Sequence, residues 1–330
     1  MRAWHRKFSR RAFLLLAAGA AALPAFAHVA VAQAYPSRPV RLVVPFAAGG
    51  GGDITARLIG QRLSERLGQQ FMIENRPGAG GNIGTEAVVR AAPDGYTLLL
   101  VLPPNAINAT LYEKLSFDFI RDIVPVAGIM RTPLVMEVNP SFPAKTVAEF
   151  IAYAKANPGK INRASGGNGT SGHVAGELFK MMTGINMLHV PYRGGAAAIT
   201  DLLGGQVQVV FDPVASSTEY IKAGKLRALA VTSTTRLEAF PDIPTLGDAV
   251  PGYEASAFFG VGAPRGTPSE IVDTLNKQVN AALADPKIKA RLVDLGGLML
   301  SGSPADFGKL IAEETEKWAK VVKFAGIKAE

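Results

Sequence analysis

The chain has 330 residues, 48% of them apolar, with 35 Lys plus Arg, 27 Asp plus Glu and no cysteine. This composition excludes a disordered, collagen-like or disulfide-stapled protein, and the length predicts about two domains. The formal charge of +8 falls to +3 when the five basic residues among the first 34 are set aside. The remaining Lys and Arg form no basic stripe of the kind that binds nucleic acid, so we expect no nucleic-acid partner.

The first 34 residues have the pattern of an export signal. A basic start is followed by an uncharged apolar run, Ala12 to Ala27, and then by small residues that end at Ala34. An uncleaved anchor is the less favoured alternative, because spanning a bilayer takes about 20 apolar residues. Arg10-Arg11 and its neighbours resemble a twin-arginine export motif, with an ordinary Sec signal as the alternative. We expect a free periplasmic protein cleaved near Ala34, with Ala27 and Ala32 as other candidate sites.

Beyond the signal, short β-branched runs alternate with amphipathic helical segments, the pattern of parallel sheets with crossover helices. In chain order, the predicted strands are 40–46, 71–74, 97–102, 123–138, 161–164, 187–190, 207–211, 226–231 and 254–263. The predicted helices are 54–67, 146–157, 172–182, 195–203, one that starts near 268, and 304–324, with 83–90 as a further strand or helix candidate. Thr146 and Glu149 have the spacing of a capping box.

The pattern predicts an α/β fold of two lobes. A strand, a glycine-rich loop and a helix occur near 43–67 and again near 161–182, so each lobe carries one such loop. The long extended stretches 129–138 and 253–263 are candidates for strands that pass between the lobes. Two crossings make the first lobe discontinuous, and we therefore assign 35–132 and 258–330 to lobe 1 and 133–257 to lobe 2.

The first glycine-rich loop runs from Phe46 through Ala48 and Gly50 to Asp53. Glycines between a strand and a helix expose successive backbone N–H groups, and the start of the helix adds partial positive charge. Such a loop stabilises a carboxylate or phosphate without a cationic side chain. The alternative is a tight turn in which Asp53 only caps the helix.

The second loop also lies between a strand and a helix, and it offers hydroxyls, an amide and bare N–H groups. Its candidate binding residues are Ser165, Gly167, Asn168, Gly169, Thr170 and His173. The G-x-G-x-x-G spacing of dinucleotide sites is formally present, but the acidic residue expected about 20 positions later is missing. Dinucleotide binding is therefore disfavoured.

Catalytic and metal-binding patterns are missing from the mature sequence. His173 and His189 are its only imidazoles, and no G-x-S-x-G elbow surrounds Ser171. The sequence has neither cysteine nor paired histidines at metal spacing, and no Gly-Lys-Ser or Gly-Lys-Thr follows either glycine run. We expect no cofactor, no metal and no enzymatic activity, and we interpret His173 as a group that orders the second loop by hydrogen bonding.

A series of ordered motifs covers nearly all of the mature chain: Tyr35-Pro-Ser-Arg-Pro-Val, Val44-Pro-Phe-Ala-Ala-Gly-Gly, Glu74-Asn-Arg-Pro-Gly-Ala-Gly-Gly-Asn-Ile-Gly, Ala92-Pro-Asp-Gly-Tyr-Thr-Leu, Ser165 to His173, His189-Val-Pro-Tyr-Arg-Gly, Asp201-Leu-Leu-Gly-Gly-Gln-Val and Gly224-Lys-Leu-Arg-Ala-Leu-Ala-Val. Together they resemble the Bug-type substrate-binding proteins of tripartite tricarboxylate transporters.

The resemblance implies a periplasmic-binding-protein-like fold of type II, in which two α/β lobes joined by hinge strands close on a small carboxylated solute. The two glycine-rich loops would face each other across the ligand, and Asn105, Tyr192 and Asp212, near strand ends, would line the cleft. Pro is common in the family where Ala48 stands and His where Asn105 stands. These departures bear on the identity of the ligand.

The expected function is capture of a di- or tricarboxylate, an acidic amino acid or an aromatic acid. The resemblance implies a monomer that delivers this ligand to the membrane subunits of a tripartite tricarboxylate-type transporter. Two alternatives stay open on the sequence. One is an exported periplasmic enzyme that acts on a small organic acid, and the other is a ligand-sensing partner of a signalling system.

Overall fold

Two groups of parallel strands form the framework of the computed structural model, which describes residues 35–192 and 194–328. In the first group, β1 (Val40–Val44) lies between β2 (Phe71–Asn75) and β3 (Thr97–Val101). In the second, β5 (Asn162–Ser165) lies between β6 (Leu188–Pro191) and β7 (Val209–Pro213). Buried β-branched and leucine residues dominate β1 and β3, as expected for strands covered on both faces.

One long strand, β4 (Ile123–Val138), belongs to both sheets. Its first part, to Pro133, pairs antiparallel with β9 (Ser256–Pro264), which also pairs with β3. From Leu134 onward, β4 pairs with β7 and with β8 (Arg227–Val231). The predicted extent of this strand, 123–138, and its passage between the two sheets are thus confirmed.

The second predicted crossing is made just before β9. The Ala255 N–H donates to the Thr232 carbonyl (3.1 Å), and the chain then enters the first sheet at Ser256. The assignment of 35–132 and 258–330 to one lobe and 133–257 to the other stays a prediction about which residues move together.

Helices cover both sheets, and the chain alternates between strand and helix as predicted. On the first sheet these are α2 (Gly51–Leu67), α3 (Asn82–Val89), α4 (Pro103–Leu111), α5 (Phe119–Asp122), α11 (Ser269–Leu283), α12 (Pro286–Asp294) and α13 (Pro304–Ala325), with the 3-10 turn η1 (Ala79–Gly81) and the short strand β10 (Leu298–Met299). On the second they are α6 (Val147–Ala156), α7 (Ser171–Thr183), α8 (Gly195–Leu203), α9 (Val214–Lys222) and α10 (Leu246–Ala249).

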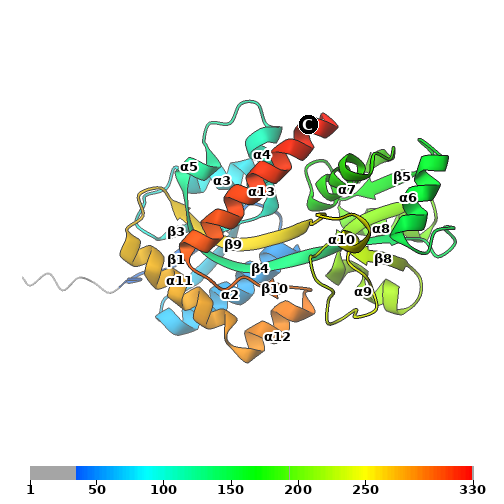
Figure 1. Ribbon diagram of the computed structural model, residues 1–330. Coiled ribbons are helices and arrows are strands. Elements are labelled where there is room, and N and C mark those ends of the chain that lie inside the picture. The colour runs from blue at the N-terminus through cyan, green and yellow to red at the C-terminus, as the bar shows by residue number, and fades with distance from the viewer. Residues whose placement is uncertain (1–34, 193, 329–330) are drawn as a thin grey trace, which may run out of the picture. The chain divides into compact units, whose positions relative to one another are not determined.

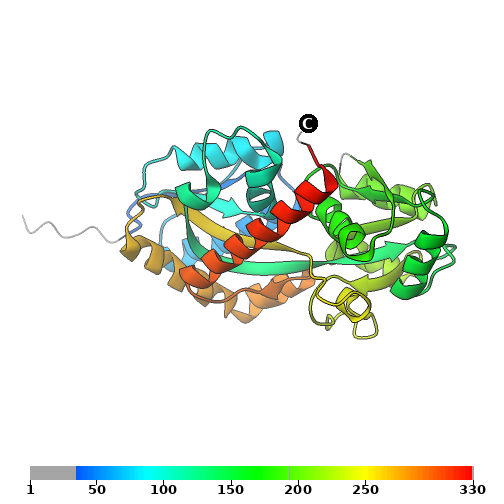
Figure 2. The same ribbon diagram turned by 45° about the horizontal axis from the view of Figure 1, so that its top comes forward.

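The last helix, α13, connects the packing of the two sheets. It runs along β4 and contacts α4 at one side and α7 of the second group (Figures 1 and 2). Its predicted apolar face is confirmed, because every member is buried: Phe307, Leu310, Ile311, Trp318, Val321 and Val322. Ser303 and Asp306 form a reciprocal capping box at its start, which fixes where this face begins.

Some local predictions differ from the structure. The Thr146 hydroxyl caps α6 by accepting the Glu149 N–H (3.2 Å), but the Glu149 carboxylate accepts the Lys145 N–H (2.7 Å), so the predicted capping box is wrong. The helices α4, α9 and α12 were not expected. Their sequences are rich in Pro, Asn, Ser and charged residues, whose helix preference is weak or whose apolar periodicity is poor.

The predicted export signal and its cleavage sites fall on residues 1–34, outside the described residues. Among the helices the structure describes, none combines the length and apolar character that a membrane crossing requires.

Candidate ligand-binding cleft

The carboxyl ends of the parallel strands in both sheets face a common cleft. In the first group, β1 leads into α2 and β3 into α4; in the second, β5, β6 and β7 lead into α7, α8 and α9. Ligands of open α/β sheets bind outside the carboxyl ends of the strands, where the helices begin. Two adjoining cavities lie here, of about 470 and about 550 Å³, and both are lined by Phe46, Gly50, Gly51, Gly52, Leu102, Thr170, Ser171, Pro213 and Ser216.

Main-chain donors dominate the polar part of this cleft. No described side chain caps α2, α8 or α9, whose N-cap residues are Gly50, Gly194 and Pro213. Other helices have such caps, for example Asp285 on α12, although α3 and α11 also begin without one. The first N–H groups of a helix have no partner within the helix, and the helix dipole makes its N-terminus attractive to anions. Three uncapped N-termini from opposite sheets therefore line one cleft.

The first loop is held in shape by Asp53, which is buried. Its carboxylate accepts the Gly49 N–H (2.9 Å) and the Arg57 Nε–H (3.0 Å), and the Arg57 guanidinium holds the pKa of Asp53 below its ordinary value. Asp53 thus stays ionised and closes the loop, and the N–H of the N-cap, Gly50, keeps no bond to it.

Packing is tight at only one glycine in the first turn of α2. A Cβ at Gly52 would lie 3.3 Å from the side chains of Leu100 and Leu102, which would have to shift slightly to admit it. At Gly51 the nearest atom, on the Phe259 ring, would be 4.0 Å from a Cβ, which is an ordinary contact.

The second loop is ordered by His173, as predicted. Its Nδ1 accepts the Gly169 N–H (3.1 Å), and Thr170 accepts the His173 N–H (3.4 Å) while donating its hydroxyl to the Gly167 carbonyl (2.8 Å). The His173 ring stacks on His189 with centroids 3.8 Å apart. Burial lowers the pKa of both imidazoles to about 3, so both are neutral at physiological pH.

Beneath this loop lies a buried ion pair that the sequence analysis missed. Arg163 on β5 is fully buried; its Nη2 lies 2.6 Å from Glu177 Oε1, and its Nη1 donates to the carbonyls of Gly172 and His173 (3.2 Å each). These bonds hold the first turn of α7 in place against β5. A single Arg in a four-residue strand has no periodic partner in the sequence that would mark it.

Five of the predicted site residues line the cavities: Phe46, Gly50, Asp53, Thr170 and Asp212. Ala48, Gly167, Asn168 and Gly169 belong to the same loops but are not among the lining residues, and Ser165 lies beneath them, bonded to His189 Nε2 (2.7 Å).

Two further predicted residues have partners away from the cavities. Asn105 is buried; its Oδ1 accepts the Leu102 N–H (2.8 Å) and its amide donates to Thr85 (2.8 Å). The Tyr192 hydroxyl donates to Asp201 (2.5 Å), which raises the pKa of Tyr192 to about 12. Asn105 therefore holds the start of α4, and Tyr192 holds the segment that follows β6.

Part of the cavity lining was not predicted from the sequence. Gly194, Gly195 and Ala196 follow β6 in the same strand, glycine and helix order as the two predicted loops, and that signal could have found them. The apolar side of the cleft is formed mainly by Ile54, Leu102, Pro103, Pro104, Met130, Ala215, Ala257, Phe259 and Leu295. Met130 on β4 and Ala257 and Phe259 on β9 are distant in sequence from the other lining residues and meet them only in the folded structure, so no local pattern predicts them. The cleft thus joins a polar, amide-rich part to an apolar part.

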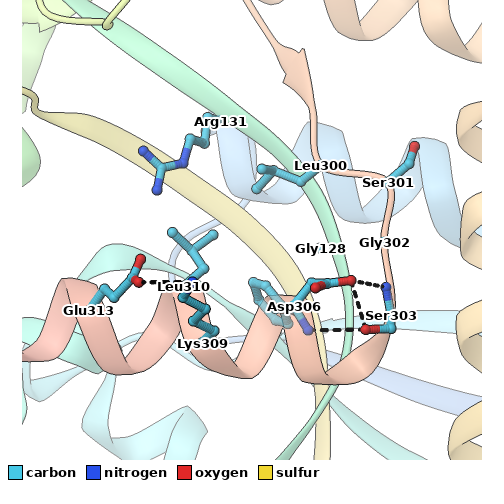
Figure 3. Close-up of a pocket in the computed structure, with 11 residues that line it drawn as sticks. Gly128, Arg131, Leu300, Ser301, Gly302, Ser303, Asp306, Lys309, Leu310 and Glu313 are labelled. Atoms are coloured by element: carbon cyan, nitrogen blue, oxygen red, sulfur yellow. Dashed lines mark hydrogen bonds and ion pairs between the residues drawn. The ribbon is translucent and has the colours of Figure 1, made fainter.

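Another pocket lies outside the cleft, between β4, the segment 300–303 and α13 (Figure 3). It measures about 260 Å³, and its polar side chains are already paired. Asp306 accepts from Ser303, Arg131 Nη1 lies 2.8 Å from Glu254, and Lys309 lies 3.8 Å from Glu313. No glycine-rich loop reaches it, so the inter-sheet cleft is the candidate site.

Comparison with known proteins agrees with this geometry. The model of the family described as "Tripartite tricarboxylate transporter family receptor" matches residues 55–327. Protein BugT of Bordetella pertussis is 37% identical over 300 residues, which cover 90% of this chain and 92% of BugT.

Two solved structures share the fold over almost their whole length. Rpa4515 of R. palustris, solved with adipate, is 41% identical with a TM-score of 0.79, covering 89% of this chain and 99% of that one. MatC of Rhodopseudomonas palustris, solved with bound malate, is 34% identical with a TM-score of 0.76, covering 87% and 100%. The expected two-lobe, periplasmic-binding-protein-like α/β fold is confirmed, and the chain belongs to the tripartite tricarboxylate transporter receptor family of solute-binding proteins.

Proposed function

We propose that this protein captures a small organic acid between its two lobes in the periplasm and delivers it, unchanged, to the membrane subunits of a tripartite tricarboxylate-type transporter. It acts as a monomer without cofactor or catalytic activity. The ligand is held by the two facing loops, 46–53 and 165–173, together with Asp212 and the glycines that begin α8. Residues such as Asn105 and Tyr192 contribute by positioning these segments.

The observation that carries the proposal is the set of uncapped helix N-termini in one cleft. No Lys, Arg or His stands among the described lining residues. Backbone N–H groups lie there in the first turns of three helices, at Gly51 of α2, Gly195 of α8 and Ala215 of α9. A carboxylate is the small anion that suits such donors, and a second carboxylate or an apolar body fits the adjoining space. Relatives solved with adipate and with malate support this ligand class.

The energetics are adequate for a reversible carrier. A charge-assisted hydrogen bond contributes about 1.5 to 3 kcal/mol net, so two or three at each end of a dicarboxylate offset a desolvation penalty of several kcal/mol per ion. The remainder suits micromolar affinity, about 8 kcal/mol. Because α2 supplies donors from one lobe and α8 and α9 supply them from the other, parting of the lobes about β4 releases the ligand.

The test is a thermal-shift screen of mono-, di- and tricarboxylates, aromatic acids and acidic amino acids, followed by calorimetric titration of the best ligand with wild type and with Gly50→Val. Gly50 has φ −78°, and its Cβ would meet nothing nearer than 4.0 Å, so valine fits the fold while narrowing the cleft. We expect binding at least tenfold weaker in this variant.

The matched control is Gly204→Val, at the far end of α8. Gly204 has φ −79° and its nearest contact would be 3.6 Å, so the same change is made outside the cleft. Normal binding by Gly50→Val would refute the proposed site. Chemical conversion of a bound acid, followed by chromatography, would instead establish an enzyme.

A further inference from the structure

Asp212, which lines the cleft, has one carboxyl oxygen without a hydrogen-bond partner among the described residues. It lies near the end of β7, 5% exposed, and lines the polar cavity. Its Oδ1 lies against Gly195, where a Cβ would come within 2.8 Å, and its Oδ2 has no hydrogen-bond partner among the described residues. The other lining carboxylate, Asp53, accepts from Gly49 and Arg57 through Oδ2, and although its Oδ1 is also buried without a partner in the described part of the chain, the Arg57 guanidinium balances its charge. A buried polar atom without a partner in a ligand cleft is a candidate contact for the ligand.

The charged groups packed around β7 give Asp212 no positive partner. On β4, Glu137 is opposite Val210 and therefore shares the face of Asp212. On β5, Arg163 is opposite Val209, on the other face, where it pairs with Glu177 of α7. The remaining groups are His173 and Lys180 on α7, Asp201 on α8, which is bonded to Tyr192, and Glu219 and Lys222 on α9, which are mostly exposed.

These surroundings favour the neutral form of the carboxyl group. Burial raises the pKa of Asp212 to about 7, although the nearby Ser216 hydroxyl opposes the rise. The pKa of Glu137 rises to about 8, chiefly through burial, with a contribution from Asp212. A ligand carboxylate placed next to an ionised Asp212 would be repelled, whereas a neutral acid offers it an O–H donor.

We propose that Asp212 recognises the ligand as a neutral carboxylic acid, donating its Oδ2–H to a carboxylate oxygen of the bound organic acid. This rests on the proposed function and deepens it, because the complex then carries one proton that free Asp212 loses at alkaline pH. Affinity should fall by up to tenfold per pH unit above about pH 7. A ligand whose ammonium group met an ionised Asp212 would show the opposite dependence, binding more tightly as pH rises.

The experiment measures adipate and malate binding by calorimetry from pH 6 to 9, in buffers of different ionisation enthalpy, for wild type, Asp212→Asn and Asp212→Ala. Asparagine keeps an N–H donor at the same place, so we expect it to retain wild-type affinity at pH 6 within about threefold and to lose the pH dependence. Alanine should weaken binding tenfold or more. Wild type should take up close to one proton per ligand at pH 8. Asp242→Asn, at an exposed position of the same lobe, is the control.

An infrared measurement adds a readout that needs no ligand. The carbonyl stretch of a protonated carboxyl group should be present in the Glu137→Gln protein at pH 6 and absent when Asp212→Asn is added. The proposal is overturned if that band is missing, or if Asp212→Asn binds tenfold more weakly than wild type at pH 6. If neither these acids nor any other carboxylate binds to wild type, the proposed function fails as well. Failure of the Asp212 proposal alone is therefore distinguished by wild-type protein that still binds an acid.

Discussion

The buried Glu137 should make the protein lose stability as pH rises. Its side chain is fully buried on β4, its Oε1 accepts the Ser217 hydroxyl (2.6 Å), and burial raises its pKa from 4.5 to about 8. A carboxyl group with a raised pKa is held protonated by the folded state but ionises in the unfolded chain. The stability it contributes is therefore fully present below about pH 4.5 and is lost as pH rises through about 8.

The size of the effect follows from the same values. At about 1.4 kcal/mol per pH unit, the change from 4.5 to about 8 corresponds to about 5 kcal/mol between pH 4 and pH 9, as an upper limit. Glu137→Gln keeps an acceptor for Ser217 and has no charge to lose. We expect its unfolding free energy to fall by several kcal/mol less than that of wild type over this range, while the two proteins differ by only about 1 kcal/mol at pH 5.

Urea denaturation at pH 5, 7 and 9 measures this difference, with equal m-values as the sign that the folded and unfolded states remain comparable. Glu219→Gln on α9 is the control, because its side chain is 86% exposed. Asp212, whose pKa is also raised, adds a pH dependence of its own to wild type and to both variants. If Glu137→Gln and wild type lose stability in parallel between pH 5 and 9, the argument that burial keeps Glu137 protonated is wrong.

Three further variants test the buried ion pair, the packing of α7 against β7 and the cap of α6. Glu177→Gln removes the charge that faces the fully buried Arg163 and should cost about 3 to 5 kcal/mol in a denaturant titration; a loss under 1 kcal/mol would contradict the buried ion pair. Gly172→Ala would place a Cβ against the Phe211 carbonyl oxygen and should lower the unfolding free energy by about 1 to 3 kcal/mol. An unchanged melting temperature would show that this contact is not tight. Thr146→Ala removes the side-chain cap of α6 and should cost about 1 kcal/mol, checked by the same titration.

The sequence predicted most of the framework because its signals are local. A glycine run between an apolar strand and a periodic helix located the β1 to α2 loop, and a 16-residue extended stretch located β4 with its observed ends. The apolar stripe of α13 was equally visible, because one helix face repeats along the chain.

The polar surroundings of the site could not be predicted in the same way. Glu137 and Asp212 are 75 positions apart, and only the antiparallel register of β4 and β7 places them on one face. Arg163 reaches Glu177 across a strand-to-helix packing that no periodicity indicates. Met130 and Phe259 line the cleft from β4 and β9, two strands that were predicted from their length. Which residues of these strands face the cleft depends on the strand register and its bulges, and the sequence does not show either.

The shared strand β4 also determines where movement can be detected. The change of partner falls between Pro133, which has no N–H, and Leu134, whose N–H donates to the Thr232 hydroxyl (2.8 Å). The single hydrogen of that hydroxyl lies within reach of both the Leu134 and the Ala255 carbonyls, so Thr232 links the outgoing strand to the returning one. The Thr232 and Ala255 N–H groups also donate across this junction, so bending here strains a few bonds centred on Thr232. The Leu134 amide proton, which is held by the Thr232 hydroxyl, should therefore report lobe opening in hydrogen-exchange experiments.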